Sequence, residues 1–448
     1  MATAEAAEAV HKRPVELLQK LIRFDTTNPP GRERECIAYI EGLLSASGIE
    51  TTTRARDPER PNLIARLPGT GQAPPLLLYG HVDVVTTENQ SWEQPPFEGV
   101  LTDGYVWGRG ALDMKSGVAM LLSAFLRAKA SGLEPAGDLV FCALSDEEGF
   151  GGYGAGWLVE THPELFEGIR YALGEFGGFT LHLGGRRFYP IQVAEKQLCT
   201  VRATFRGAGG HGAMPVRGGA MSQLGDALER LDSRRLPVHI TPVVREMAGA
   251  IARAAPLSAR LPLRALVDPR LTDRVLHLMG ERGRNFAPLV RNTVSPTIVQ
   301  ASDKVNVIPS AVTLTMDGRL LPGLGPEDLV RELHELLGPG PELEVVRHDP
   351  ASGEPDMGLF ELLGSALRDL DPGCVPVPLL MAGVTDGRFL SRLGIQTYGF
   401  LPMKLPPDFD FWQYIHAANE RIPAEAVDFG SEAVYRVLER YGKDEVHA

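Results

Sequence analysis

The first 160 residues alternate between segments with apolar residues at helical spacing and short apolar runs of strand length. The predicted helices cover residues 14–24, 34–46, 116–130 and 154–160, and the predicted strands cover 62–67, 75–79 and 139–144. Such alternation predicts an α/β layer structure with a largely parallel sheet and helices on both faces. Ligand sites in sheets of this kind lie beyond the carboxyl ends of the strands.

The pattern changes after about residue 190 and returns to its first character after about residue 350. Between these points, 198–205 and 311–317 alternate like half-exposed strands, and 219–235 and 325–337 have helical spacing. The segment 240–295 is rich in Arg, Leu and Pro, so it predicts further helices but no chemistry. We therefore expect one domain over 1–190 and 346–448, interrupted by an inserted α+β domain over 191–345.

Composition narrows the class of protein. The 448 residues carry a net charge of −12, which gives no support for nucleic-acid binding. The absence of a run of about 18 apolar residues argues against a membrane span. The acidic N-terminus does not resemble a secretory signal. Four scattered cysteines without paired spacing indicate reduced thiols, so we expect a cytoplasmic protein that binds neither membranes nor nucleic acid.

Polar residues cluster where the predicted apolar strands end. His81 and Asp83 follow the strand at 75–79, and the adjacent Glu147 and Glu148 follow the strand at 139–144. Neighbouring side chains at a strand end point in different directions, so one carboxylate can hold a cation while the other handles a proton. Asp113 lies in a third polar segment of the same kind. These segments predict a metal site assembled at one edge of the sheet.

Zinc is bound by histidine nitrogen and carboxylate oxygen, typically with four ligands. Two zinc ions about 3.5–4 Å apart need a bridging carboxylate. Suitable groups in this chain are His81, Asp113, Glu148, Glu175 and His416. Each has a simpler interpretation when taken alone. A lone histidine is usually a hydrogen-bonded structural residue, an aspartate after a strand often caps a helix or forms a turn, and paired glutamates can be a solvated acidic turn.

The chain resembles a known zinc-dependent amidohydrolase and exopeptidase family, which includes glutamate carboxypeptidase, aminoacylase, acetylornithine deacetylase and succinyl-diaminopimelate desuccinylase. The resemblance covers nearly the whole chain. The segments that carry it are GHVDVV at 80–85, GRGALDMKSG at 108–117, SDEEG at 145–149, GEFGG at 174–178, GGHGAMP at 209–215, NVIPS at 306–310, GVTDGRF at 383–389 and HAANE at 416–420. Their order and combination are highly specific, although no single segment is.

The resemblance implies two zinc ions, or cobalt or manganese in their place, because ligand types alone do not select the metal. His81 and Glu175 would hold one ion, Glu148 and His416 the other, and Asp113 would bridge them. The interrupted domain would then be the catalytic zinc-binding domain, and the insert would serve as a lid and dimerisation domain. The resemblance also implies a homodimer.

The resemblance further assigns roles in catalysis. Asp83 would orient His81 and fix its tautomer. Glu147 would be the general base that takes a proton from metal-bound water and passes it to the leaving amine. His211 would stabilise the oxyanion, from the same subunit or from the partner of a dimer. Many relatives have serine after this histidine, where this chain has Gly212. Without the resemblance, His211 is simply a polar residue in a glycine-rich loop.

Substrate selection follows from the same resemblance. Asn306 and Arg319 would contact the substrate, with the arginine fork binding its carboxylate through parallel hydrogen bonds. A surface ion pair is an equally good interpretation of Arg319. Thr385 and Arg388 lie in a loop with Asp386 that would border the pocket, and Arg388 is a second candidate partner for the carboxylate.

Together these features predict a dizinc hydrolase that cleaves an amide adjacent to a free carboxylate, as an N-acyl-amino-acid amidohydrolase or as a carboxypeptidase or dipeptidase. Its substrate would be a small molecule with a free carboxylate. The alternative is a catalytically inactive small-molecule-binding protein of the same fold. Such a protein should lack a metal ligand or the base, and this chain has all of them.

Overall fold

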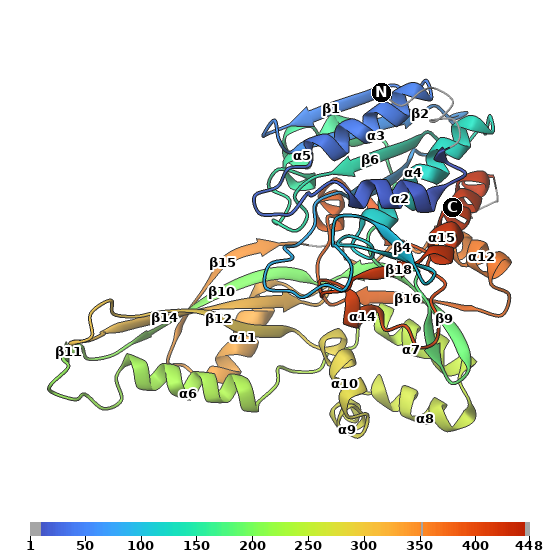
Figure 1. The fold of residues 1–448 in the computed structure, drawn as a ribbon. Helices are drawn as coiled ribbons and strands as arrows, with labels where there is room; N and C mark the ends of the chain where they lie inside the picture. Colours follow the sequence, from blue (N-terminus) through green and yellow to red (C-terminus); the bar gives the residue numbers. More distant parts are fainter. Residues whose placement is uncertain (1–9, 351–352, 444–448) are drawn as a thin grey trace. The chain divides into compact units, whose positions relative to one another are not determined.

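The computed structural model describes residues 10–350 and 353–443, without the side chains of residues 257–259, 281, 282 and 285. These residues form two compact units (Figure 1). The first unit contains residues 10–193, Pro355–Leu379 and the chain from Thr385 onward. The second contains Ala194–Glu354, as far as it is described, and Leu380–Val384.

A mixed sheet with a parallel centre organises the first unit. The strand order is β1-β2-β6-β3-β7-β17-β9-β16, and β8 pairs with β9. Strands β6, β3, β7 and β17 are parallel to one another. The pairs β1–β2, β2–β6 and β17–β9 are antiparallel. The bounds are β1 (Thr51–Ala55), β2 (Pro61–Leu67), β3 (Leu76–His81), β6 (Leu139–Leu144), β7 (Tyr171–Gly174), β8 (Leu181–Leu183), β9 (Arg186–Glu195), β16 (Val375–Met381) and β17 (Gln396–Gly399).

Helices cover both faces of this sheet. Alternate residues of β6 face opposite sides: Phe141 packs on Phe125 of α4, whereas Val140 and Cys142 pack in a core cluster with Leu158 of α5. Every residue of β6 is buried, as expected for a strand covered on both faces. The helices are α2 (Pro14–Ile22), α3 (Arg34–Ala46), α4 (Lys115–Ala130), α5 (Ala155–Thr161), η1 (Pro163–Phe166), α12 (Phe360–Leu370), α13 (Gly387–Leu390), η3 (Ser391–Leu393), α14 (Phe411–Tyr414) and α15 (Ala424–Arg440).

A small antiparallel sheet, in the order β18-β5-β4, joins two loops that are far apart in the sequence. Its strands are β4 (Val100–Thr102), β5 (Tyr105–Trp107) and β18 (Arg421–Pro423). Arg421 pairs with Trp107, so the segment before β18 lies beside the segment after β5. This pairing brings the loop with His416 next to the loop with Asp113.

The second unit is an α+β structure. Its antiparallel sheet has the order β12-β14-β10-β15, and α6 and α11 pack together on one face of it (Figure 1). A separate two-stranded ribbon pairs β11 with β13. The bounds are β10 (Gln197–Arg206), β11 (Gly210–His211), α6 (Ala220–Ser233), β12 (Thr293–Gln300), β13 (Val307–Ile308), β14 (Ala311–Leu320), α11 (Pro326–Leu337) and β15 (Glu342–Asp349).

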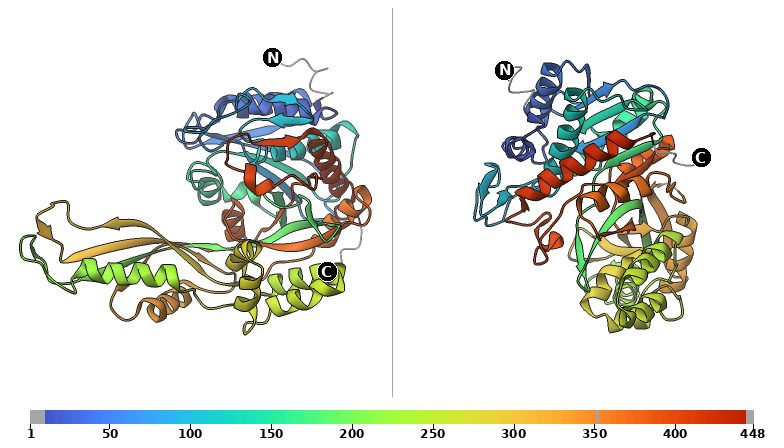
Figure 2. Two further views of the ribbon diagram at one scale, coloured as in Figure 1. Left: turned by 60° about the horizontal axis from the view of Figure 1, so that its bottom comes forward. Right: turned by 90° about the vertical axis from the view of Figure 1, so that its right-hand side faces the viewer.

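Short helices fill the segment between α6 and β12, in agreement with the helices predicted for 240–295. They are α7 (Pro242–Ala254), α8 (Leu257–Leu266), α9 (Thr272–Leu278), α10 (Glu281–Phe286) and η2 (Ala287–Val290). Figure 2 shows them gathered together in yellow-green. Successive helices α7, α8, α9 and α10 contact one another. No helix within the described residues is both long enough and apolar enough to cross a membrane.

Candidate metal centre

The parallel register of the central strands brings the predicted ligands to one edge of the sheet. His81, the last residue of β3, lies beside Leu144, the last residue of β6. The chain that leaves β6 therefore carries Glu147 and Glu148 past His81. On the other side of β3 lies β7, and Glu175 directly follows that strand. Three neighbouring strands thus deliver their polar ends to the same place.

Asp113 lies between the two histidines. Its Oδ1 is 3.2 Å from Nε2 of His81, and its Oδ2 is 3.0 Å from Nε2 of His416. Glu148 Oε1 lies 3.2 Å from the same His416 nitrogen, and Glu175 Oε2 lies 3.9 Å from Nε2 of His81. The structure therefore brings together all five predicted ligands, with Asp113 between His81 and His416.

This donor set fits two divalent cations. Asp113 belongs to two groups whose potential ligand atoms lie within 4.8 Å of one another, one with His81 and Glu175 and one with Glu148 and His416. Among the described residues, Glu175 Oε2 is buried and has no hydrogen-bond partner. An unpaired buried carboxylate oxygen is costly, and coordination of a cation would remove that cost.

Proton affinities in the cluster reflect the crowding of charge. Burial raises the pKa of Glu175 well above its usual value, and burial also raises the pKa of Glu148. For Asp113 burial acts in the same direction, but hydrogen bonds from His416 and His81 outweigh it and lower the pKa. Hydrogen bonds to Asp113 and Glu148 raise the pKa of His416 to about 10. Such strongly shifted groups are typical of functional sites.

Asp83 organises the turn that carries the paired glutamates. Its two carboxylate oxygens each accept a backbone N–H, from Glu147 and from Glu148, at 3.1 Å. Its Oδ1 is also 3.4 Å from Nδ1 of His81, whose shortest contact on that side is the Asp83 backbone oxygen at 3.0 Å. The buried carboxylate of Asp83 therefore contacts His81, a predicted ligand, and holds the backbone of Glu147, the predicted base.

Glu147 lies in a buried and charged setting. Burial raises its pKa well above the usual value, and the nearby carboxylates of Asp386 and Glu148 act in the same direction. Nη1 of Arg388 is 3.7 Å from Glu147 Oε1 and donates a 2.8 Å hydrogen bond to the backbone oxygen of Thr385. Thr385 is fully buried, and its hydroxyl oxygen accepts a hydrogen bond from the backbone N–H of Gly387. Both loop residues thus lie in the same unit as the cluster, next to the predicted base.

Two supports of the site were not predicted from the sequence. Asn28 donates to Asp83 at 2.8 Å and to Asp146 at 3.0 Å, and Arg60 pairs with Asp146 at 2.9 Å. Asp146 has a φ of 67°, a left-handed conformation that non-glycine residues seldom adopt and that these contacts help to hold. Nothing in the sequence near Asn28 or Arg60 indicates these distant partners.

The second unpredicted support is Glu420. Its buried carboxylate accepts backbone N–H groups from Leu112 at 2.7 Å and from Asp113 at 3.2 Å. It also pairs with Arg109 at 2.6 Å, and Arg109 donates to the backbone oxygen of His416 at 3.3 Å. The pair therefore ties the loop of Asp113 to the loop of His416. A signal was present, because both residues lie in segments that carry the family resemblance.

An aromatic wall borders the cluster. Asp113 and Glu175 line a narrow cavity together with Phe176, Phe179 and Phe411. The rings of Phe179 and Phe411 stack with centroids 4.3 Å apart, and Trp412 packs against the same rings. Trp412 remains 55% exposed, so the apolar wall reaches the surface.

The remaining predicted residues belong to the second unit. His211 is exposed on the β11–β13 ribbon, and the amide of the next residue, Gly212, donates to the backbone oxygen of Asn306 at 2.8 Å. His211 and Asn306 therefore lie on adjacent segments. Arg319 forms a forked ion pair with Asp317, at 2.7 and 3.0 Å, through Nε and Nη2. Among the described residues, no hydrogen bond uses its Nη1.

Comparison with known proteins agrees with this geometry. A model of peptidase family M20/M25/M40 matches residues 77–440. The chain belongs to this family. The human N-fatty-acyl-amino acid synthase/hydrolase PM20D1 is 26% identical over 386 residues, which span 83% of this chain and 75% of the relative. The resemblance found in the sequence is confirmed, and family membership makes the chain a metallohydrolase.

Solved structures show the same fold at low sequence identity. The M20 family metallo-carboxypeptidase from Sulfolobus solfataricus has a TM-score of 0.68 at 16% identity, covering 96% of this chain and 99% of its own. The YXEP protein of Bacillus subtilis, described as a dinuclear metal-binding peptidase of the M20 family, has a TM-score of 0.61 at 13% identity, with 97% and 98% coverage. The predicted fold class is confirmed.

Proposed function

We propose that this chain hydrolyses an amide bond next to a free carboxylate, in an N-acyl-amino acid or at the C-terminal end of a peptide, with two zinc ions as its cofactor. The observation that carries the proposal is Asp113, whose two oxygens lie 3.2 Å from Nε2 of His81 and 3.0 Å from Nε2 of His416. Bound zinc would lower the pKa of water to about 7 and polarise the amide carbonyl. Cobalt or manganese could occupy the same ligands.

The chain's own residues supply the proton transfers. Glu147 takes a proton from the attacking water and delivers it to the nitrogen of the leaving amine. Asp83 holds the backbone of Glu147 at 3.1 Å, which keeps the base in place during both transfers. Burial raises the pKa of Glu147, so its carboxylate can accept the proton and hold it until it is released.

Replacement of the base is the direct test. Glu147→Gln keeps the shape of the side chain and removes its basicity, while every proposed metal ligand stays. A positioned general base contributes about 10²–10⁴-fold to rate, so kcat should fall by about that factor with metal content unchanged. Turnover and metal content of the purified variant are the two measurements.

Glu160→Gln is the matched control, because Glu160 lies on α5 of the same unit and is exposed. It should retain both turnover and metal. If Glu147→Gln turns over substrate at the parent rate, Glu147 is not the base. If it loses metal, Glu147 is a ligand, and the assignment of roles at the cluster fails.

Recognition of the substrate carboxylate falls to Arg319 in this proposal. Asp317 occupies Nε and Nη2, so the outer nitrogen Nη1 is left to bind a carboxylate, and Asp317 holds the guanidinium in one orientation. Arg388 is the alternative partner, because its Nε and Nη2 have no hydrogen-bond partner among the described residues. It is 1% exposed, which favours a role in positioning Glu147 over one in direct binding.

A pair of substrates separates these possibilities. The parent enzyme should prefer an N-acyl-amino acid over the same compound with an amidated carboxyl end. A hydrogen bond to a charged group contributes about 1.5–3 kcal/mol, so Arg319→Gln should lower kcat/KM for the free acid by about 10- to 100-fold and leave the amide nearly unaffected. Steady-state kinetics on both compounds measures the preference.

Arg206→Gln serves as the control for this experiment, because Arg206 is an exposed, ion-paired arginine on β10 of the same sheet. It should leave the preference intact. Loss of the preference in Arg388→Lys but not in Arg319→Gln would move carboxylate binding to Arg388.

The aromatic wall beside Asp113 and Glu175 reaches the surface at Trp412, which is 55% exposed and would contact an apolar acyl or side-chain group of the substrate. A catalytically inactive binding protein of the same fold remains the alternative function. The complete set of ligands and the buried base argue against it, and turnover of any N-acyl-amino acid or dipeptide by the metal-loaded chain would exclude it.

The proposal includes a homodimer in which His211 stabilises the developing oxyanion. His211 lies on an exposed ribbon, and among the described residues its imidazole is engaged only at Nδ1, which accepts the backbone N–H of Ala213 at 3.1 Å. Nε2 can then donate to an oxyanion.

A further inference from the structure

One segment of the second unit reverses the charge of the chain. Between Arg234 and Arg291 there are eleven arginines, no lysine and four acidic residues, in a protein whose net charge is −12. The segment contains no recognisable catalytic or metal-binding motif. Helices α7 to α10 therefore form a positively charged region in an acidic protein. Such a concentration of positive charge attracts anionic ligands.

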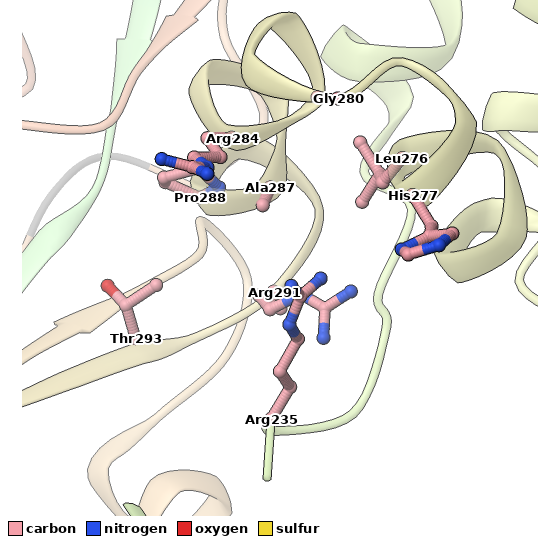
Figure 3. Close-up of a pocket in the computed structure, with 10 residues that line it drawn as sticks. Arg235, Leu276, His277, Gly280, Arg284, Ala287, Pro288, Arg291 and Thr293 are labelled. Atoms are coloured by element: carbon pink, nitrogen blue, oxygen red, sulfur yellow. The ribbon is translucent and has the colours of Figure 1, made fainter. Parts of the chain in front are cut away.

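Three of these arginines line a cavity of about 500 Å³. Its lining includes Arg235 from the loop after α6, His277 from α9, Arg284 from α10, Arg291 before β12, and Thr293. Figure 3 shows these side chains around one space, with Arg235 extending toward Arg291. The volume lies within the range of cavities that hold small molecules. All of these residues belong to the second unit, whereas the carboxylate–histidine cluster belongs to the first.

Arg291 is the buried centre of this lining. It is only 4% exposed, and Nη1 donates to the backbone oxygen of Leu236 at 3.0 Å. Nη2 pairs with Asp273, whose side chain is 60% exposed. Within the described residues, Nε is buried without a hydrogen-bond partner. A buried donor of a charged group without a partner is costly, so a ligand oxygen at this position would be stabilising.

Two further guanidinium groups have no counter-ion among the described side chains. Arg235 and Arg284 are exposed, and no described residue forms an ion pair with either one. Asp273 is thus the one described carboxylate paired with the arginines of the lining. Guanidinium groups present forked donors that match carboxylate and phosphate oxygens.

A buried lysine holds Thr293 in place. The hydroxyl oxygen of Thr293 accepts a hydrogen bond from Nζ of the buried Lys196 at 3.1 Å. The same lysine also donates to the backbone oxygen of Arg291 at 2.9 Å. Lys196 thereby fixes the backbone and the hydroxyl at one side of the cavity.

We propose that this cavity is a binding site for a small organic anion, held through a phosphate group or paired carboxylates by Arg235, Arg284 and Arg291. The apolar parts of Leu276, Ala287 and Pro288 line the rest of the space and would contact the carbon skeleton of the ligand. This site is independent of the proposed hydrolysis, because it uses none of the residues assigned to it.

Titration calorimetry on the metal-loaded full chain tests the proposal. Inorganic phosphate and succinate are the probes, and chloride at the same ionic strength is the reference. The double variant Arg235→Gln, Arg284→Gln removes two exposed side chains, so the core stays intact. Loss of two charge-assisted contacts should raise the dissociation constant by at least about tenfold. Arg235→Lys keeps the charge but loses the fork, and should show a smaller increase.

Arg234→Gln is the matched control, since it removes the same charge from an exposed neighbour that does not line the cavity. It should change the dissociation constant by less than about twofold. Binding of phosphate alone or succinate alone supports the site and identifies the ligand group. The proposed site would be overturned if neither probe binds at about 10 mM, or if anionic lipid vesicles bind and the two probes do not. It would also be overturned if binding survives in the double variant, because phosphate bound to the metal ions would give that result.

Discussion

At the scale of single residues, Lys196 gives the clearest dependence of stability on pH. It is fully buried, and burial lowers its pKa to about 7, with Arg319 and Arg291 acting in the same direction. In the unfolded chain the pKa returns to 10.5, so the unfolded state binds more protons between about pH 7 and 10.5. The free energy of unfolding should therefore rise with pH across this window.

Lys196→Met removes this titration. Between pH 8 and 10 the unfolding free energy of the parent should rise relative to the variant by roughly 2 kcal/mol, since each unit of differential protonation contributes about 1.36 kcal/mol. Urea unfolding at several pH values measures both proteins. All other titrating groups are shared, so they cancel in the difference. Parallel curves would show that Lys196 keeps its ordinary pKa in the folded protein.

Individual site residues differ in how far the sequence can reveal them. His81, Glu148 and Glu175 follow apolar strands, and the parallel sheet then brings them together, so local pattern and family resemblance predict their meeting. Their roles as ligands stay predictions. Asn28 contacts Asp146 across 118 positions of sequence and has no local pattern of its own. Such a supporting contact depends on how distant loops pack, which no periodicity contains.

At the scale of elements, one buried carboxylate joins two loops of the metal centre. Glu420 accepts three backbone N–H groups from Gly110, Leu112 and Asp113, and pairs with Arg109. Breaking a buried ion pair by removing one charge costs about 3–5 kcal/mol. Glu420→Gln should lower the free energy of unfolding by that order and weaken metal retention, because the loop of Asp113 loses its anchor. Urea unfolding and metal content after dialysis measure the two effects.

Asp408→Asn is the control, since Asp408 is an exposed acid in the same C-terminal part of the chain. Its unfolding free energy should change by less than about 0.5 kcal/mol, as is usual for surface positions. If Glu420→Gln retains metal as firmly as the control does, the two loops hold their positions without this carboxylate.

Buried elements could be predicted from the sequence more readily than exposed ones. The buried strand β6 and the helix α4 carry patterns that the sequence shows directly, and both lie within a residue or so of the predicted ranges. Strands β12 and β15 gave no clear pattern. They are the two edges of the second sheet and are largely exposed along their length, and β12 has an irregular register after Pro296. Edge strands with two polar faces lack the alternation on which the prediction depends.

At the scale of the whole molecule, the proposed mechanism divides its residues between two units. Glu147 and the ligands lie in the first, and His211 lies in the second. A substitution can therefore remove Glu147 from the first unit and leave His211 in the second unit intact, or the reverse. This separation allows a test of whether the proposed dimer completes each site with His211 from the partner subunit.

Two inactive variants, Glu147→Gln and His211→Ala, should complement each other in a mixed dimer. With different tags on co-expressed chains, two-step purification yields dimers that contain one copy of each. If His211 acts across the dimer, one site pairs an intact Glu147 with an intact His211, and the other site has neither. Turnover per dimer should then reach about half of the parent value, because a two-fold dimer has two equivalent sites. Each variant alone should remain slow, and a mixed dimer as slow as its parents would mean that His211 serves its own chain. Sedimentation of the parent as a monomer would remove the proposed dimer altogether.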